Sequence, residues 1–269
     1  MITSNNNAKV KQVVQWQTKA KERRKDHVFL AEGIRMCEEA PVKNVREVYL
    51  MEELEQKIRQ NARNGDTAFW DKLQQTGYET VSTEVFAKMA DTQTPQGILT
   101  VLEQPVYDLT QLLEQPDPLF LMLENLQDPG NLGTMIRTGE GAGITGVIMN
   151  NQTVDIFNPK TIRATMGSIF RVPFVYVPDL ALVLEQMHAK GIYTYAAHLK
   201  GQEYYDSFSF REPTAFLIGN EGNGLSKEIS DQAGQYLKIP MEGRVESLNA
   251  SIAAALLMYE AHRQRSARL

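Results

Sequence analysis

The chain of 269 residues contains one cysteine, Cys37, so it cannot form an intramolecular disulfide, and such low cysteine use suits a reducing compartment. The apolar neighbours of Cys37 predict a small core residue rather than a reactive thiol. No apolar run approaches the length of a membrane span, and the polar start does not resemble a signal peptide. We therefore expect a cytoplasmic protein with no contact with a membrane.

Positive charge is also limited, because 28 lysines and arginines stand against 33 acidic residues and give a net charge of −5. This balance excludes a protein coated in positive charge, but RNA binding needs only a local basic surface. Seven lysines and arginines crowd the first expected helix, among them Lys21, Arg23, Arg24 and Lys25. Trp16 lies between them and is predicted to stack on a base. The alternative is a solvated helix face with one buried tryptophan.

The chain divides near residue 105. Before that point short helical and extended segments alternate, which predicts a small α/β domain over residues 1–105. The expected helices cover residues 7–26, 53–63 and 84–90, and the expected strands cover 45–50, 78–81 and 98–102. Three prolines mark residues 106–118 as a linker.

Residues 119–269 alternate more regularly and predict an α/β domain with a parallel sheet covered by helices on both faces. The expected strands are 119–124, 146–150, 172–177, 192–197, 214–218 and 236–240, and the expected helices are 132–142, 159–167, 179–190, 225–233 and 247–265. The dinucleotide fingerprint G-x-G-x-x-G is absent after the first of these strands. An ordinary Rossmann domain is therefore not expected.

Three loops at the ends of strands carry the polar residues of this domain. The first, N-L-Q-D-P-G-N-L-G-T-M-I-R, runs from Asn125 to Arg137 and contains Asn131. Its D-P-G-N segment is typical of a turn between a strand and a helix. In α/β sheets such loops carry the functional side chains, so we expect a site here.

The second loop, I-G-N-E-G-N-G, contains Gly219 and Glu221, and its glycines allow positive φ angles and a close approach to a ligand. The third, I-P-M-E-G-R-V-E-S-L-N, begins at Ile239 and leads into a helix that Ser247 is expected to N-cap. None of the four histidines falls in the three loops. A proton acceptor or charge stabiliser in this site must therefore be another residue type.

These loops resemble motifs 1, 2 and 3 of the SpoU (TrmH-type) RNA 2′-O-ribose methyltransferases in the SPOUT superfamily. The patterns N-x-x-D-P-x-N-x-G-x-x-x-R, I-G-N-E-G-x-G and I-P-M-x-G-x-x-x-S-L-N are intact, and the resemblance extends from Leu119 to the C-terminus. It implies a C-terminal trefoil knot, S-adenosylmethionine (SAM) bound in that knot, and a homodimer. Residues 1–105 resemble the family's RNA substrate-binding module.

The resemblance also implies a reaction, the SAM-dependent methylation of a ribose 2′-hydroxyl in RNA, and no metal ion. It implies catalytic roles for Arg137, Asn131, Glu221, Ser247 and Asn249, and cofactor contacts from Gly219, Ile239 and Leu248. Leu199, at the end of the strand expected at 192–197, is a further candidate for a cofactor contact. A guanidinium is a donor whose pKa lies far above neutrality, so a role as base is difficult. Arg137 either holds the 3′-phosphate, while that phosphate or a water takes the proton, or acts transiently as the base.

The RNA is expected to be ribosomal, by analogy with family members that carry an extra N-terminal domain. The alternatives are a transfer-RNA 2′-O-methyltransferase, a methyltransferase that acts on a tRNA base, and a non-catalytic RNA-binding factor. The last would not need intact Asn131, Arg137, Glu221 and Asn249. The run of three alanines at 253–255 suits close helix packing, including packing across a dimer interface.

Overall fold

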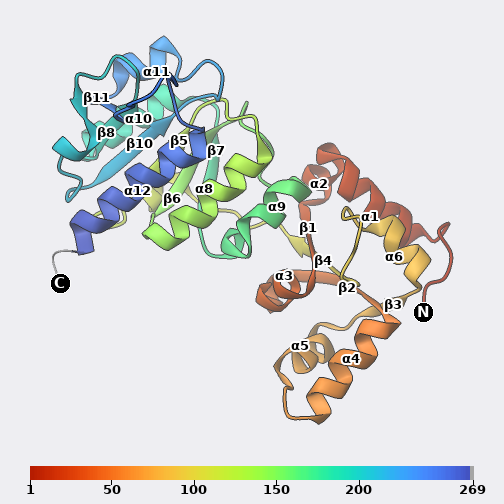
Figure 1. Cartoon of the computed structure of the whole chain (residues 1–269). Coiled ribbons are helices and arrows are strands. Elements are labelled where there is room, and N and C mark those ends of the chain that lie inside the picture. The colour runs from red at the N-terminus through yellow and green to blue at the C-terminus, as the bar shows by residue number, and fades with distance from the viewer. Residues whose placement is uncertain (267–269) are drawn as a thin grey trace. The chain divides into compact units, whose positions relative to one another are not determined.

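A computed structural model of the chain describes residues 1–266. The chain forms two compact units, both drawn in Figure 1. The first unit contains Met1–Pro105 together with Asp155–Phe170, and the second contains Val106–Val154 and the chain from Arg171 onward. Residues 155–170 therefore belong to the first unit, although they lie between two strands of the second in the sequence.

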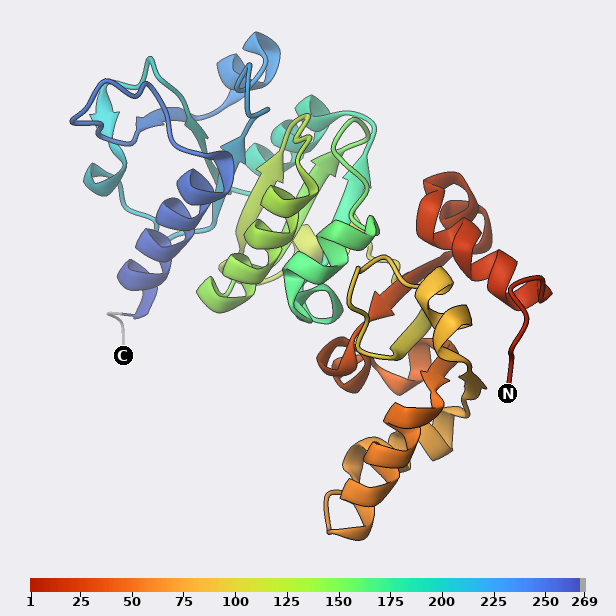
Figure 2. The same ribbon diagram turned by 45° about the vertical axis from the view of Figure 1, so that its right-hand side comes forward.

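The first unit is built on a four-stranded sheet in the order β1-β4-β2-β3. β4 pairs antiparallel with β1 and β2, and β2 pairs parallel with β3. The strands are β1 Val28–Glu32, β2 Val45–Met51, β3 Glu79–Val81 and β4 Ile98–Glu103. The helices are α1 Ala8–Thr18, α2 Ala20–Asp26, α3 Ile34–Glu39, α4 Glu52–Arg63, α5 Ala68–Thr76, α6 Thr83–Met89 and α9 Pro159–Thr165. Figure 2 shows α4 and α5 side by side.

Side-chain alternation along β2 explains why helices cover both faces of this sheet. Tyr49 is buried on one face, in a core that contains Phe86 of α6. Val48 and Leu50 are buried on the other face with residues of α3, α4 and α5. Cys37 lies in that second core with 2% of its surface exposed, and burial raises the pKa of its thiol to about 12. The prediction of a core cysteine is confirmed.

The single helix predicted over residues 7–26 is wrong, because the backbone is extended at Lys19 (φ −124°, ψ 109°) and separates α1 from α2. The buried guanidinium of Arg23 fills this break, and its Nη1 donates a hydrogen bond to the Trp16 carbonyl oxygen at 2.6 Å. That carbonyl lies at the end of α1, where a helix lacks its own donors. Nη2 of Arg23 forms an ion pair with Asp155 at 2.6 Å. A partner 132 residues away therefore stabilises the break.

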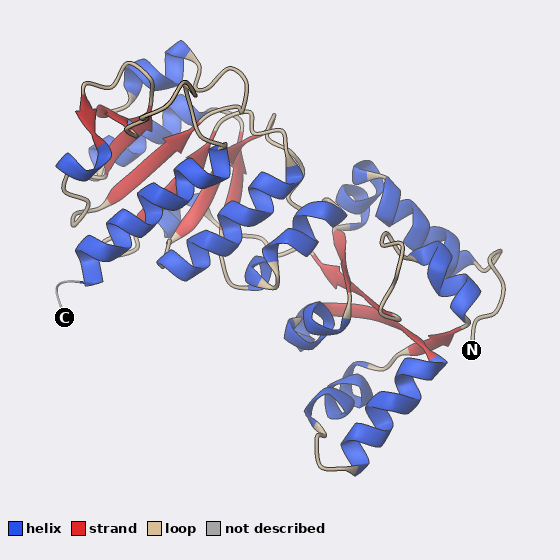
Figure 3. Cartoon of the chain, viewed as in Figure 1, coloured by secondary structure: helices blue, strands red, loops and turns tan. Residues whose placement is uncertain are grey.

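The second unit contains a seven-stranded sheet in the order β7-β6-β5-β10-β8-β11-β9, with parallel pairing throughout. The strands are β5 Leu119–Leu123, β6 Gly146–Asn150, β7 Phe174–Val177, β8 Tyr193–Ala197, β9 Glu203–Tyr204, β10 Thr214–Ile218 and β11 Gln235–Lys238. The helices are α7 Leu109–Leu113, α8 Pro129–Ala142, α10 Leu180–Ala189, α11 Lys227–Gln232 and α12 Ala250–Ser266. Figure 3 shows helices on both faces of this sheet, which confirms the predicted fold class.

Strands β5 and β10 form the centre of the second unit, and all residues of both are buried. From β5 the chain continues to β6 and β7 on one side, whereas β8 and β11 lie on the other side of β10. The carboxyl ends of β5 and β10 are therefore where the strand order reverses, the usual place for a ligand in an open parallel sheet. The trefoil knot stays a prediction. Within residues 1–266 no helix is both long and apolar enough to cross a membrane.

Three local features of the second unit differ from the sequence-based expectations. Helix α8 begins at Pro129, because Asp128 is its N-cap and accepts a hydrogen bond from Asn131 N at 2.8 Å. The expected turn at D-P-G-N is thus the first turn of the helix. The predicted linker contains α7, whose Leu112 is buried in the core of this unit. Strand β9 was not predicted.

We predict that Arg23→Ala lowers the free energy of unfolding by about 3 kcal/mol, because it removes the partner of the Asp155 carboxylate and the donor to the Trp16 carbonyl. Arg24→Ala is the matched control, since Arg24 is exposed and its loss should cost less than about 0.5 kcal/mol. Urea denaturation followed by circular dichroism measures both values. Equal stability of the two variants would contradict this role for Arg23.

Candidate active site

The three loops singled out in the sequence meet at one edge of the sheet in the second unit. Residues 124–128 follow β5, residues 219–226 follow β10, and residues 239–249 follow β11 and lead into α12. Residues 198–200 follow β8, which lies between β10 and β11. Neighbouring parallel strands end at the same edge, so segments far apart in the sequence form one site.

The loop after β10 is a tight turn that depends on glycine at two positions. Asn220 N donates to Gly224 O at 3.0 Å, and Gly224 N donates back to Asn220 O at 2.8 Å. A Cβ atom on Gly219 would lie 2.0 Å from the carbonyl carbon of Gly224, so no side chain fits there. Gly224 has a φ of +69° and so uses the positive φ that these glycines allow, whereas Gly219 and Gly222 do not have a positive φ.

A line of hydrogen bonds joins all three motifs. The Glu221 carboxylate accepts from Gln127 N at 3.1 Å, from Asp128 N at 3.0 Å and from Asn131 Nδ2 at 3.0 Å. Asn249 Nδ2 then donates to Asn131 Oδ1 at 3.0 Å. The structure therefore brings three of the five predicted catalytic residues into direct contact.

The same hydrogen bonds set the ionisation of Glu221. Partial burial raises the pKa of its carboxyl, but the hydrogen bonds from Asn131 Nδ2 and the amides of Gln127 and Asp128 lower it by more. The net pKa of Glu221 lies below its usual value, so the side chain is a carboxylate at neutral pH. An ionised carboxylate only accepts hydrogen bonds, which fits its three donors.

Ser247 is not the N-cap of the last helix, contrary to the prediction. Asn249 takes that place, because its Oδ1 accepts from Ser251 N at 2.9 Å and from the Ser251 hydroxyl at 2.6 Å. Helix α12 accordingly begins at Ala250. Both residue types are good caps, but only Asn has an Nδ2 that can also reach Asn131. Ser247 instead lines a cavity next to this network.

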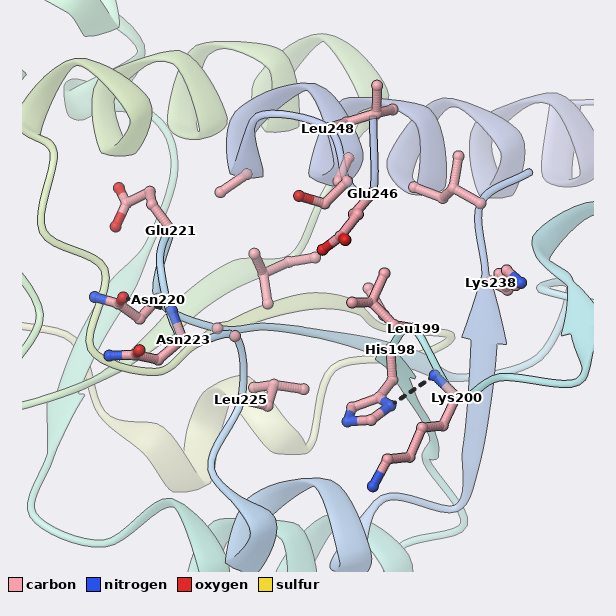
Figure 4. Close-up of a pocket in the computed structure, with 18 of the residues that line it drawn as sticks. His198, Leu199, Lys200, Asn220, Glu221, Asn223, Leu225, Lys238, Glu246 and Leu248 are labelled. Atoms are coloured by element: carbon pink, nitrogen blue, oxygen red, sulfur yellow. Dashed lines mark hydrogen bonds between the residues drawn. The ribbon is translucent and has the colours of Figure 1, made fainter. Parts of the chain in front are cut away.

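A cavity of about 350 Å³ lies beside this network, within the range of small-molecule sites. Leu199, Gly219, Ile239 and Leu248 all line it, so the structure places the four predicted cofactor contacts around one cavity. Figure 4 shows Leu199 and Leu248 on its walls, with the loop that carries Glu221 along one side.

The cavity wall also contains residues that the motifs did not indicate. His198 lies at the end of β8, stacks on Tyr236 with ring centroids 4.7 Å apart, and accepts a hydrogen bond from Lys200 N at 3.1 Å. Burial, and next the nearby Lys200, lower the pKa of His198, which favours the neutral ring. Glu246 and Lys238 also line the cavity (Figure 4). The position of His198 after a predicted strand was the one sequence signal for it.

Arg137 lies outside the network that joins the other motif residues. It is on α8, six residues after Asn131, which places it about 240° further around the helix. Its side chain is exposed, does not line the cavity, and has no hydrogen bond or ion pair within residues 1–266. The structure therefore separates Arg137 from the Asn131, Glu221 and Asn249 side chains.

Two of the five residues predicted to contact RNA are buried in the first unit. Trp16 is 3% exposed and donates from Nε1 to Asp26 at 2.8 Å, so its ring is not available to stack on a base. Arg23 is held in the break between α1 and α2. These two predictions are wrong, because both side chains have partners inside the protein. Lys21, Arg24 and Lys25 are exposed on α2.

The cavity has the chemistry that SAM needs. A flat adenine ring requires apolar cover and a close backbone edge. Leu199, Leu225 and Leu248 line the cavity and would supply the cover, and the glycines of the 219–225 loop would allow the close approach. The charged amino-acid tail of the cofactor requires polar groups, and Lys200 and Glu246 line the same cavity. Within residues 1–266 no cluster of His, Cys, Asp and Glu side chains could hold a metal ion.

Comparisons with known proteins match both parts of the chain. Residues 118–259 match the model of the SpoU rRNA Methylase family, and residues 7–100 match that of the MRM3-like substrate binding domain. The 23S rRNA (guanosine(2553)-2′-O)-methyltransferase RlmP of Bacillus subtilis (strain 168) is 34% identical over 261 residues, which cover 96% of this chain and 97% of RlmP.

Solved structures agree with the sequence matches. An AdoMet-bound rRNA methyltransferase from Sinorhizobium meliloti superposes with a TM-score of 0.84 at 30% identity and covers 97% of both chains. The SpoU methyltransferase AviRb from Streptomyces viridochromogenes gives a TM-score of 0.82 at 28% identity, over 97% of this chain and 99% of AviRb. With its motifs intact and both domains matched, the chain belongs to the SpoU rRNA methylase family.

Proposed function

We propose that this protein transfers the methyl group of SAM to a ribose 2′-hydroxyl of RNA, and that the RNA is ribosomal. The observation that carries the proposal is the line of hydrogen bonds from Glu221 through Asn131 to Asn249, next to a cavity lined by Gly219 and Leu248. The near full-length match to RlmP, including the N-terminal domain, favours ribosomal over transfer RNA. We also propose a cytoplasmic location, which the match to a bacterial ribosomal RNA methyltransferase supports.

The cofactor, when bound, supplies an activated methyl group, so the protein must bind, orient and assist deprotonation of the hydroxyl. Leu199, Ile239 and Leu248 would cover the adenine, and the tight turn at Gly219 would bring backbone groups to its edge. Orientation of two reactants in a closed site is worth about 7–11 kcal/mol. The protein therefore needs few reactive side chains of its own.

Asn131 is the residue we assign to orient the ribose hydroxyl. The Glu221 carboxylate only accepts hydrogen bonds, so Asn131 must turn Nδ2 toward it and Oδ1 toward Asn249. Each group of the Asn131 amide has one further hydrogen-bonding position, an N–H on Nδ2 and a lone pair on Oδ1. The network thus fixes the direction in which Asn131 presents a donor and an acceptor to a hydroxyl.

Arg137 is assigned to the RNA backbone. Its exposed guanidinium has no partner within residues 1–266, so it is available to hold a phosphate with two parallel hydrogen bonds. The phosphate next to the target ribose, or a water held by it, then accepts the hydroxyl proton. This assignment avoids a neutral guanidinium, which ordinary solution pH does not produce.

The first unit is assigned to RNA binding. Lys21, Arg24 and Lys25 are exposed on the seven-residue helix α2 and concentrate positive charge in a chain that is acidic overall. Such a local basic surface attracts phosphates even when net charge is negative. The match of residues 7–100 to a substrate-binding domain supports the assignment.

We also propose that the protein is a homodimer through α12. Ile252, Leu256 and Tyr259 expose 50%, 37% and 49% of their surfaces along one side of this helix. Ala254 is fully buried within its own subunit, so it is not part of this face. Tyr259 Oη lies 2.8 Å from the place a Cβ of Gly141 would take. Arg137 is one turn before Gly141 on the same side of α8, so dimerisation would bring it to the interface.

We expect wild-type protein to transfer labelled methyl from SAM to ribosomal RNA, and nucleoside analysis to recover a 2′-O-methylated nucleoside. Arg137→Ala should lower turnover at least about a hundredfold while SAM affinity stays unchanged, because Arg137 does not line the cavity. Arg137→Lys should fail similarly if two parallel hydrogen bonds are needed. A base-methylated product would refute the function, and normal turnover by folded Arg137→Ala would refute the role of Arg137.

Replacement of Lys21, Arg24 and Lys25 by alanine should weaken RNA binding and reduce its logarithmic salt slope by about 2, because fewer counterions are released. Filter binding at several salt concentrations measures the slope. Calorimetry should find the same SAM affinity as in the wild type. An unchanged salt slope would mean that α2 is only a solvated surface.

Leu256→Arg should convert the protein to a monomer that has lost SAM affinity, because α12 directly follows the cavity-lining residues 246–248. Leu256 is partly exposed in the single chain, so the charge should not unfold it. The matched control is Leu182→Arg, at a residue of α10 that is 54% exposed. Light scattering and calorimetry measure both properties. A monomeric variant with wild-type SAM affinity would disprove that SAM binding depends on the dimer.

A further inference from the structure

Glu124 is a buried carboxylate with no part in the mechanism above. It is the first residue after β5, and 7% of its surface is exposed. Its Oε2 accepts a hydrogen bond from Ser226 N at 2.7 Å, across 102 residues of sequence. Burial removes a carboxylate from water at a considerable cost in free energy. An apolar residue at this position would avoid that cost, so we expect the Glu124 carboxylate to have a role.

Glu124 holds both ends of the loop that lines the cofactor cavity. Its backbone N–H donates to Ile218 O, at the end of β10, over 3.0 Å. Its carboxylate binds Ser226, the N-cap residue of α11. All residues from Gly219 to Leu225, between these two anchors, line the cavity. One residue behind the loop thus fixes the positions of both of its ends.

The other hydrogen bonds that anchor the loop involve Asn220, Glu221 and Gly224. Asn220 Oδ1 accepts from Gly222 N at 2.9 Å, and Asn220 Nδ2 donates to the Asn125 carbonyl oxygen at 2.9 Å. These bonds hold the turn but do not reach Leu225 or Ser226. Among the hydrogen bonds of residues 1–266, the one between Glu124 and Ser226 ties this far end of the loop to β5.

We propose, on the basis of the function proposed above, that Glu124 is a positioning residue for the cofactor. Its carboxylate fixes the Ser226 end of the loop, and with it the backbone surface that receives SAM. Glu124 does not line the cavity, so its effect on the cofactor passes through the loop. The affinity for SAM therefore depends on a side chain that SAM does not touch.

Calorimetric titration of the full-length protein with SAM tests this role. Glu124→Ala should raise the Kd for SAM about tenfold or more, because it removes a hydrogen bond to a charged group and leaves Ser226 N without an acceptor. Glu124→Gln keeps an oxygen acceptor of the same shape and should restore the Kd to within about threefold of the wild type. In steady-state assays the KM for SAM should rise and the KM for RNA should not.

A second pair of variants removes the donor rather than the acceptor. Ser226→Pro deletes the N–H, and the backbone φ of −61° at Ser226 suits proline. Ser226→Ala keeps the N–H and loses only the side-chain cap of α11. Only the proline variant should bind SAM as weakly as Glu124→Ala. The double variant should bind no more weakly than either single one, because both remove the same bond.

The outcomes separate this role from the proposed function. Wild-type protein that fails to bind SAM would reject the function. Wild-type affinity in folded Glu124→Ala, or in Ser226→Pro if Glu124→Ala does not fold, would overturn the role of Glu124. Asp179→Ala, which removes a carboxylate cap from α10 in the same unit, is the control for general destabilisation. A matching loss of SAM affinity in that control would also overturn the role.

Discussion

The geometry of the site depends on one carboxylate, that of Glu221. It comes from the loop after β10, yet its three hydrogen-bond donors come from the loop after β5 and the first turn of α8. Those donors include the backbone N–H groups of Gln127 and Asp128, which lie where a helix start concentrates positive potential. A negative charge is stabilised there, so Glu221 stays ionised and ties two loops together. The orientation of Asn131, and through it that of Asn249, follows from this single charge.

The sheet makes that contact possible because it brings the two loops to one place. β5 and β10 are adjacent and buried along their whole length, so the positions of their carboxyl ends are set by the core. Glu124 binds both ends of the loop after β10, through its backbone N–H to Ile218 O and through its carboxylate to Ser226 N. Glu221, within the loop, binds the segment after β5. The cavity proposed to bind the cofactor lies between the carboxyl ends of the strands and a turn that has room only for glycine at 219. The shape of the cavity and the orientation of Asn131 thus both depend on the loops after β5 and β10.

Most of the second unit could be predicted because its signals are local. Apolar strands, turn residues and three intact motifs each lie within about a dozen residues. Two of the errors arise where a residue distant in the sequence determines the local structure. Asn249 rather than Ser247 caps α12, because its side chain also reaches Asn131. Arg23 is buried rather than exposed, because it forms an ion pair with Asp155. Asp155 belongs to the same unit, although in the sequence it lies between β6 and β7 of the second unit. The sequence of residues 7–26 contains no signal for the ion pair between Arg23 and Asp155. The sequence analysis therefore counts Arg23 among the exposed basic residues, although it is buried.

Arg137 is exposed on α8 and lies outside the hydrogen-bond network of Asn131, Glu221 and Asn249. Asn131 faces the network, whereas Arg137 projects from another side of the same helix and has no partner within residues 1–266. The two side chains project from α8 in directions about 240° apart around its axis, so only Asn131 belongs to the network with Glu221. A contact between Arg137 and the rest of the site would come from a molecule that covers the exposed side of α8. An RNA phosphate there would give the guanidinium its only strong partner, and the apolar face of α12 beside it would exclude water. Under the role proposed for Arg137, catalysis would require bound RNA, because an RNA phosphate would supply the hydrogen-bond acceptors of the guanidinium.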